Sequence, residues 1–163
     1  MKRRVEHGGD LWRGRRKSRR PLATRRAVHV VFRSSLAKGA WSFLSARHAV
    51  YVREQLPKVA RRYGVRLYET SNNGNHIHLL LRARTQEGLK SFFMVFCGKL
   101  ASRITGARRG KPFGRRFFDH VPYTRIVEWG KAFKVAKNYV LKNALEARGL
   151  ITHHRPKKPR APD

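Results

Sequence analysis

Two histidines of this chain are spaced to act together on a metal ion. His76 and His78 flank Ile77 in a short apolar run that follows the turn signal Asn73-Gly74. Such a run predicts a β-strand, on which alternate side chains share a face. Both imidazoles would then point the same way while Ile77 points into a core. Two imidazoles side by side on a rigid strand provide half of a metal site.

A tyrosine and an asparagine later in the chain could complete that site. Tyr139 and Asn143 are four residues apart in a run that predicts a helix, which places them one turn apart on one face. A phenol can act as a nucleophile, and an amide oxygen can join two imidazoles on a metal. Taken alone, each signal is weak. A His-x-His pair on a strand is more often a polar pair on a half-exposed face, and a tyrosine at a helix border usually packs with its hydroxyl in water.

These residues are positioned by elements whose predicted order is strand, helix, strand, strand, helix, strand, helix. The expected strands span residues 27–32, 65–71, 76–83 and 117–127, and the expected helices span residues 46–63, 86–105 and 128–148. Thr85 and Gly106 are the expected ends of the middle helix, and Pro57 is expected to kink or split the first one. The last helix carries an apolar stripe that includes Leu141, with Tyr139 at its border.

This order of elements predicts an α+β fold, a ferredoxin-like antiparallel sheet with helices on both faces. Two helices would cover one face of the sheet. The terminal helix would then lie across the other face, toward which His76 and His78 would point. That arrangement brings Tyr139 close to the two histidines. The remaining histidines, including His29, have no partner pattern in the sequence, so we interpret them as structural or solvated.

Composition predicts one domain with a polyanionic partner. The 163 residues include 39 lysines and arginines against nine acids, a net charge of +30, and nucleic acid is the first choice of partner. A membrane is the weaker alternative, because no run of 18 apolar residues is present, and no signal-peptide core lies near Met1. A single cysteine, Cys97, excludes an intramolecular disulfide and a Cys-rich zinc site. A cytoplasmic location is the default expectation.

The scarcity of acids argues against carboxylate-based two-metal chemistry. Between residues 25 and 150 the acids are scattered: Glu54, Glu69, Glu87, Asp119, Glu128 and Glu146. A histidine-based site for one metal needs far fewer of them. We further expect residues 1–24 to be a disordered basic arm, residues 25–150 to form the functional domain, and residues 151–163 to be a basic, proline-rich tail.

The motifs resemble the single-tyrosine HUH transposases, and within them the REP-associated branch. The name HUH describes histidine, a bulky apolar residue and histidine, here His76-Ile77-His78, with the nucleophile Tyr139 on a later helix and an amide, Asn143, four residues on. Flanking segments resemble the family as well, over roughly residues 25–150: Tyr68-Glu69, Phe117-Phe118-Asp119 and the run 143–150.

The resemblance implies a metal-dependent transposase that cleaves and rejoins single-stranded DNA through a 5′-phosphotyrosine at Tyr139. It implies Mg²⁺ or Mn²⁺ held by His76, His78 and Asn143, and a DNA hairpin near the cleavage site. From the residues, Arg115 and Arg116 are candidates for backbone contacts, and Lys142 for holding the phosphate, although a solvated lysine is the simpler interpretation. We expect a monomer or homodimer.

Two alternatives remain open from the sequence. One is a non-catalytic basic module that binds RNA or DNA on a ferredoxin-like sheet. The other is a nickase of the replication-initiator or relaxase kind, which shares the HUH chemistry but usually carries further domains.

Overall fold

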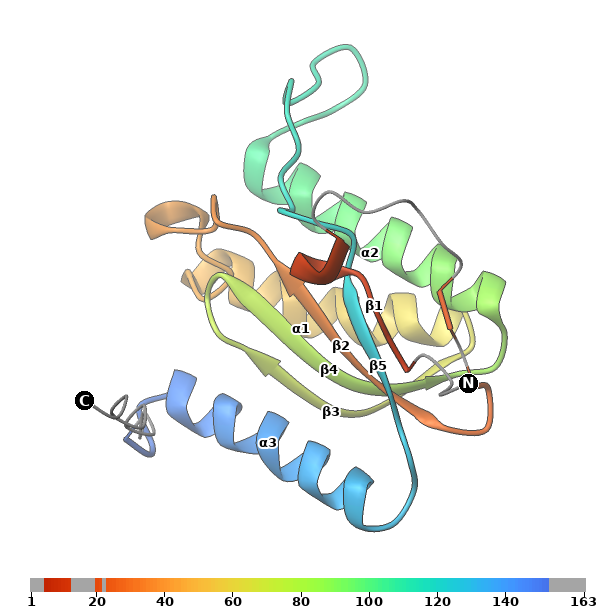
Figure 1. Cartoon of the computed structure of the whole chain (residues 1–163). Helices are drawn as coiled ribbons and strands as arrows, with labels where there is room; N and C mark the ends of the chain where they lie inside the picture. The colour runs from red at the N-terminus through yellow and green to blue at the C-terminus, as the bar shows by residue number, and fades with distance from the viewer. Residues whose placement is uncertain (1–4, 13–19, 22, 153–163) are drawn as a thin grey trace, which may run out of the picture.

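The described part of the chain folds into a five-stranded antiparallel sheet with three α-helices (Figure 1). The computed structural model describes residues 5–12, 20, 21 and 23–152. The strands are β1 (Glu6–His7), β2 (Ala27–Arg33), β3 (Val65–Asn72), β4 (His76–Ala83) and β5 (Tyr123–Val127). The helices are α1 (Ala46–Arg62), α2 (Gln86–Thr105) and α3 (Lys131–Ala147), with short 3₁₀ turns η1 (Gly9–Trp12) and η2 (Gly39–Trp41).

The strand order across the sheet is β1-β5-β2-β4-β3, and every neighbouring pair is antiparallel. From β2 to β5 the elements follow a βαββαβ order, with the last strand beside the first. This is the ferredoxin-like arrangement that the sequence predicts, so the α+β fold class is confirmed.

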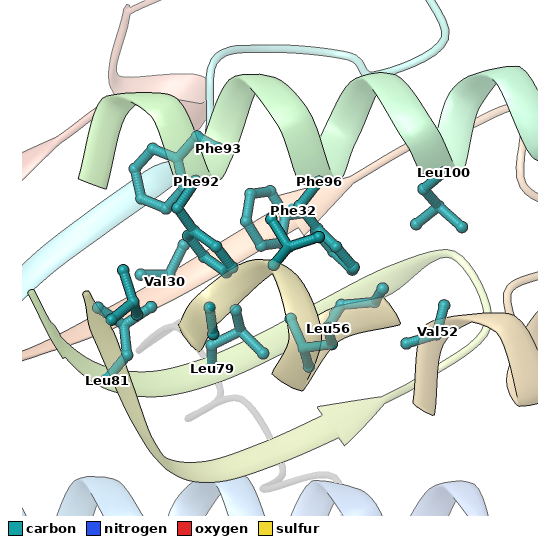
Figure 2. Close-up of a cluster of buried hydrophobic side chains, with 14 of the residues drawn as sticks. Val30, Phe32, Val52, Leu56, Leu79, Leu81, Phe92, Phe93, Phe96 and Leu100 are labelled. Carbon is teal, nitrogen blue, oxygen red and sulfur yellow. The ribbon is translucent and has the colours of Figure 1, made fainter. Parts of the chain in front are cut away.

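The main core lies between the sheet and the layer formed by α1 and α2. Strand residues such as Phe32 and Leu79 pack there against α2 residues such as Phe92 and Phe96, all of them essentially buried (Figure 2). A smaller cluster on the opposite face joins Ala27, Leu80 and Val127 to Phe133 and Ala136 of α3 and to Tyr68. Helices therefore cover both faces. Because β4 alternates, its histidines lie on the α3 side.

Local signals set the ends of α2, whereas the proline inside α1 does not divide that helix. The Thr85 side chain accepts a hydrogen bond from the Gly88 amide, and Gly106 ends the helix at φ 73°. Pro57, in contrast, does not split α1, which continues as one helix from Ala46 to Arg62. Pro57 and Arg53, whose carbonyl the proline cannot bond, are both exposed, so water can satisfy that carbonyl.

Four further expectations are corrected. The last strand begins at Tyr123 rather than at residue 117, because Pro122 cannot donate to the sheet. Helix α3 begins at Lys131 rather than at residue 128, and Leu141 is exposed rather than part of its buried stripe. Finally, residues 1–24 are expected to form a disordered basic arm. The described part of that range instead contains β1 and η1, which pack on β5.

The rest of that arm, residues 1–4, 13–19 and 22, and the tail from residue 153 lie outside the described residues. Among the helices that the structure describes, none combines the length and the apolar character needed to cross a membrane.

Candidate metal and nucleic-acid site

Strand β4 presents its two histidines toward α3, where Tyr139 lies. The ring centroids of His76 and His78 are 4.8 Å apart, and the ring of Tyr139 approaches His78 edge-on at 5.6 Å. Tyr139 is 51% exposed, whereas His78 is 5% exposed. The structure therefore brings a solvent-accessible phenol next to a buried imidazole, on the same side of the sheet.

A third histidine, His29 of β2, joins this group and was missed from the sequence. Val31 lies opposite His78 in the β2–β4 pairing, and His29 is two residues away on the same face. The His29 Nε2 atom lies 3.1 Å from His78 Nδ1, and the two rings are stacked with centroids 5.3 Å apart. We expected His29 to be structural or solvated. The alternation of side chains along β2 predicts the face of the sheet on which His29 lies. Which strand pairs with β2, however, cannot be predicted from the residues near His29 in the chain.

The hydrogen bond with His29 leaves the other nitrogen of His78 without a partner. Among the described residues, His78 Nε2 is buried and makes no hydrogen bond. Burial, with the neighbouring His76 and His29, lowers the pKa of His78 to about 3, and burial with Arg125 lowers the pKa of His29 to about 4. Both imidazoles are therefore neutral at physiological pH, which is the form that binds a metal.

The ring of His76 is oriented by its neighbour in the chain. Its Nδ1 atom lies 2.6 Å from Asn75 Oδ1, which leaves Nε2 for another ligand. Burial, and next the positive charge of Arg33, lower the pKa of His76. This imidazole is thus also held in its neutral form.

Asn143 lies one turn after Tyr139 on α3, but its side chain folds back onto its own helix. Asn143 Nδ2 donates to the Tyr139 carbonyl at 2.8 Å, and the Asn143 carbonyl accepts from Asn73 Nδ2 at 3.3 Å. The second contact ties α3 to the turn before His76. In the described residues no hydrogen bond joins the Asn143 side chain to either His76 or His78.

The donor set fits a divalent metal in part. Two neutral imidazoles share a face, and one of them has a buried nitrogen without a partner, as a metal ligand would in the absence of its ion. Over the described residues, no three histidine, cysteine or carboxylate side chains are grouped so that they could hold a metal. A third protein ligand would therefore be an amide, and Asn143 would have to rotate its side chain to supply it.

Helix α3 lies against β3 and β4 and leaves a groove beside β5. This groove of about 820 Å³ lies between α3 and the strands, and Tyr139 and His29 are in its lining. The other lining residues are Val5, Tyr123, Arg125, Ile126, Val127, Glu128, Lys131, Ala132, Val135 and Ala136. A second pocket of about 420 Å³ includes Val31, Arg33, His120 and Tyr123. Tyr123 lines both, so the two pockets are neighbours on the open part of the sheet face.

The three basic residues expected to bind DNA are exposed, and they lie on two different parts of the fold. Arg115 lies in the loop between α2 and β5, with its guanidinium 5.3 Å from the centre of the Phe113 ring. Arg116 is its neighbour in this loop, which extends away from α3 (Figure 1). Lys142 lies on α3 with its Nζ atom 3.9 Å from Glu146 Oε1. Arg33, Arg125 and Lys131, in contrast, line the two pockets.

Of the comparisons with known proteins, the one with solved structures found a similarity. No known family matches the chain, and no curated protein matches it. Among solved structures, the chain is similar to a crystal structure described as a "putative transposase" from Deinococcus radiodurans. The similarity covers 78% of this chain and 98% of that chain, with 14% sequence identity and a TM-score of 0.46.

Proposed function

We propose that this protein is a metal-dependent transposase of the single-tyrosine HUH kind, which cleaves and rejoins single-stranded DNA. The observation that supports the proposal most is the pairing of Tyr139 with His78. An exposed phenol lies beside a buried neutral imidazole whose Nε2 atom has no partner in the described residues. The groove is lined by Tyr139 and by His29, whose ring bonds to His78, and the chain has a net charge of +30.

His76 and His78 would hold the metal, Mg²⁺ or Mn²⁺, with the amide oxygen of Asn143 as a further ligand. When bound, the ion would polarise the scissile phosphate as a Lewis acid. His29 would hold His78 in one tautomer through the bond to Nδ1. The neutral state of all three imidazoles, which burial favours, keeps His76 and His78 available without the removal of a proton.

Tyr139 would be the nucleophile. Its phenol oxygen forms a bond to phosphorus, and the bond between phosphorus and the 3′-oxygen of the preceding nucleotide breaks. The phenol loses its proton, and the leaving oxygen gains one to become a 3′-hydroxyl. Because the 5′-phosphotyrosine is a phosphodiester like the bond it replaces, a 3′-hydroxyl can attack it and rejoin strands without a nucleotide cofactor.

A non-catalytic nucleic-acid-binding module is the second candidate. The position of the Asn143 side chain favours it, because the amide bonds to the Tyr139 carbonyl rather than turning toward the histidines. Such a module would use the same groove and charge but would form no covalent bond with DNA. The nucleophile is thus the point at which the two proposals differ.

The test is formation of a covalent adduct on a pool of single-stranded oligonucleotides with a hairpin and randomised flanks. Protein, DNA and Mg²⁺ or Mn²⁺ are mixed, and adducts are separated under denaturing conditions. Tyr51→Phe is the matched control, because Tyr51 is half-buried on α1, on the other side of the sheet. The original chain and Tyr51→Phe should form an adduct that chelator abolishes. Tyr139→Phe should form none while it still binds the pool.

An adduct in Tyr139→Phe would exclude Tyr139 as the nucleophile. Binding without an adduct in every protein, over all metals and sequences in the pool, would favour the binding module instead.

A further inference from the structure

The segment formed by residues 5–12, here called the N-terminal segment, is built onto the sheet. Glu6 and His7 pair with Arg125 and Thr124 of β5, and the Ile126 amide donates to the Val5 carbonyl at 2.9 Å. Farther along, the Gly9 amide donates to the Val121 carbonyl at 3.0 Å. Figure 1 shows this segment running beside β5 at the edge of the sheet. It is therefore held by backbone hydrogen bonds, which a solvated charged arm would lack.

The N-terminal segment contributes to both pockets on the open sheet face. Val5 lines the groove that leads to Tyr139, and Gly9, Asp10 and Leu11 line the neighbouring pocket. Tyr123 lines both pockets and lies on β5, the strand that pairs with this segment. The segment is thus an outer wall of the surface that continues to the nucleophile.

Two acids of this segment hold side chains that face the pockets. Glu6 Oε1 accepts a hydrogen bond from the Tyr123 hydroxyl at 2.9 Å and lies 3.7 Å from Arg125 Nε. Asp10 Oδ1 lies 3.1 Å from His120 Nε2. The chain has only nine acids, so two at this edge are a notable share. They fix an aromatic ring and potential phosphate-binding groups in place.

The lining suits unpaired nucleic acid. Apolar and aromatic side chains such as Val135 and Tyr123 can contact bases, while Arg33, Arg125 and Lys131 can contact phosphates. Proteins that bind single strands combine a cationic groove with aromatic rings in this way. Bases within a duplex are stacked on one another and would not enter pockets of this kind.

We propose that the N-terminal segment forms the outer wall of a binding groove for single-stranded DNA, and that it determines which phosphate of the strand reaches Tyr139. The part of this inference that concerns the position of the cut rests on the proposed function. The part that concerns DNA in the groove does not, because binding needs no cleavage.

Gly8 offers a way to displace the segment without changing any charge or any side chain in the groove. It adopts φ 79°, and a Cβ atom added there would lie 2.3 Å from the Pro122 carbonyl oxygen. Gly8→Ala must therefore push the segment away from β5. Gly110→Ala is the matched control, because Gly110 has the same φ of 79° but no atom within 4 Å of an added Cβ. Both variants strain the backbone, and only the first separates the segment from the sheet.

The first experiment detects DNA in the groove by photo-crosslinking. A benzophenone amino acid replaces Leu11, which lines the smaller pocket, in the Tyr139→Phe protein, so that no cleavage can occur. The control position is Met94, which is 65% exposed on α2. Benzophenone at the Leu11 position should crosslink to single-stranded oligonucleotides much more than benzophenone at the Met94 position does. Adding Gly8→Ala should reduce that yield roughly tenfold, the loss expected when contact with about one stacked base is removed. Gly110→Ala should not.

The second experiment maps the cut at nucleotide resolution in proteins that retain Tyr139. Gly8→Ala should cut at shifted or several positions, and Gly110→Ala at the original one. The proposal that DNA lies in the groove would be overturned if benzophenone at the Leu11 position crosslinked no more strongly than at the Met94 position. An unchanged crosslinking yield in Gly8→Ala would overturn it as well. An unchanged cut position and rate in Gly8→Ala would overturn the role in positioning. If no protein forms an adduct, the proposed function and the positioning role that rests on it both fail, while the crosslinks still decide the groove.

Discussion

His29 Nε2 lies 3.1 Å from His78 Nδ1, and this contact decides which nitrogen of His78 can bind another group. One of the two atoms carries the proton of the hydrogen bond. If His78 donates, its Nε2 atom keeps a lone pair, and that atom is buried without a partner among the described residues. Histidines that bind metals commonly donate from the other nitrogen to such a partner, which fixes tautomer and ring orientation. His29 would thus be a positioning residue for His78.

Replacement of His29 should weaken metal binding without unfolding the protein. His29→Leu removes the acceptor, so His78 loses its fixed tautomer, and Mn²⁺ affinity measured by calorimetry should fall by about 10–100-fold. His29→Gln offers a carbonyl oxygen in its place and should recover much of the affinity. The ¹⁵N shifts of the His78 ring without metal report the tautomer directly. A single Nδ1–H tautomer retained in His29→Leu would contradict this role.

The Asn143 side chain should matter to metal binding only through its amide oxygen. Asn143→Ala removes that oxygen and should lower Mn²⁺ affinity and adduct formation together. Lys142→Ala is the neighbouring control, because Lys142 is exposed and pairs with Glu146, so its loss should leave metal affinity unchanged. Equal Mn²⁺ affinity in Asn143→Ala and the original chain would show that the amide stays on the Tyr139 carbonyl, where it lies here.

Acid should destabilise the fold below about pH 6.5, the pKa of histidine in an unfolded chain. Burial lowers the pKa of His29 to about 4 and that of His78 to about 3. Between about pH 6.5 and these lower pKa values, the unfolded chain binds protons that the folded chain does not. The free energy of unfolding therefore falls as the pH falls. Urea titrations at pH 7.5, 6 and 5 measure the decline. A double variant with glutamine at both positions should show a shallower decline, and an identical one would refute the assignment.

Two glycines of α2 should respond in opposite directions to alanine. At Gly98 an added Cβ meets nothing within 4 Å, so Gly98→Ala should stabilise the protein by roughly 0.5–1 kcal/mol through helix propensity. At Gly88 the added Cβ would lie 2.5 Å from the Tyr63 carbonyl oxygen, so Gly88→Ala should destabilise it. Thermal unfolding of both variants gives the sign, and a gain in stability for Gly88→Ala would contradict the close packing seen here.

The amino-acid sequence by itself determined the type and order of the elements from β2 to α3, and the face on which the histidines of β4 lie. The alternation in β4 separates His76 and His78 from Ile77 and the core, because successive strand residues point to opposite faces. The ends of α2 follow from Thr85 and Gly106, since caps act within one helical turn. The order of the elements was enough for the ferredoxin-like topology. These properties depend on residues that are close together in the chain.

Only the tertiary structure decided which residues from different elements meet. His29 and His78 are 49 positions apart and come together because β2 pairs with β4 in one register. The sequence predicted a charged arm for the N-terminal segment, because the composition there offers little to bury. In the structure the segment instead pairs with the edge of β5 and satisfies the backbone groups of that edge. The difference between Gly88 and Gly98 likewise depends on the Tyr63 carbonyl, which comes from before β3. Strand pairing and packing are long-range interactions, so no local pattern specifies them.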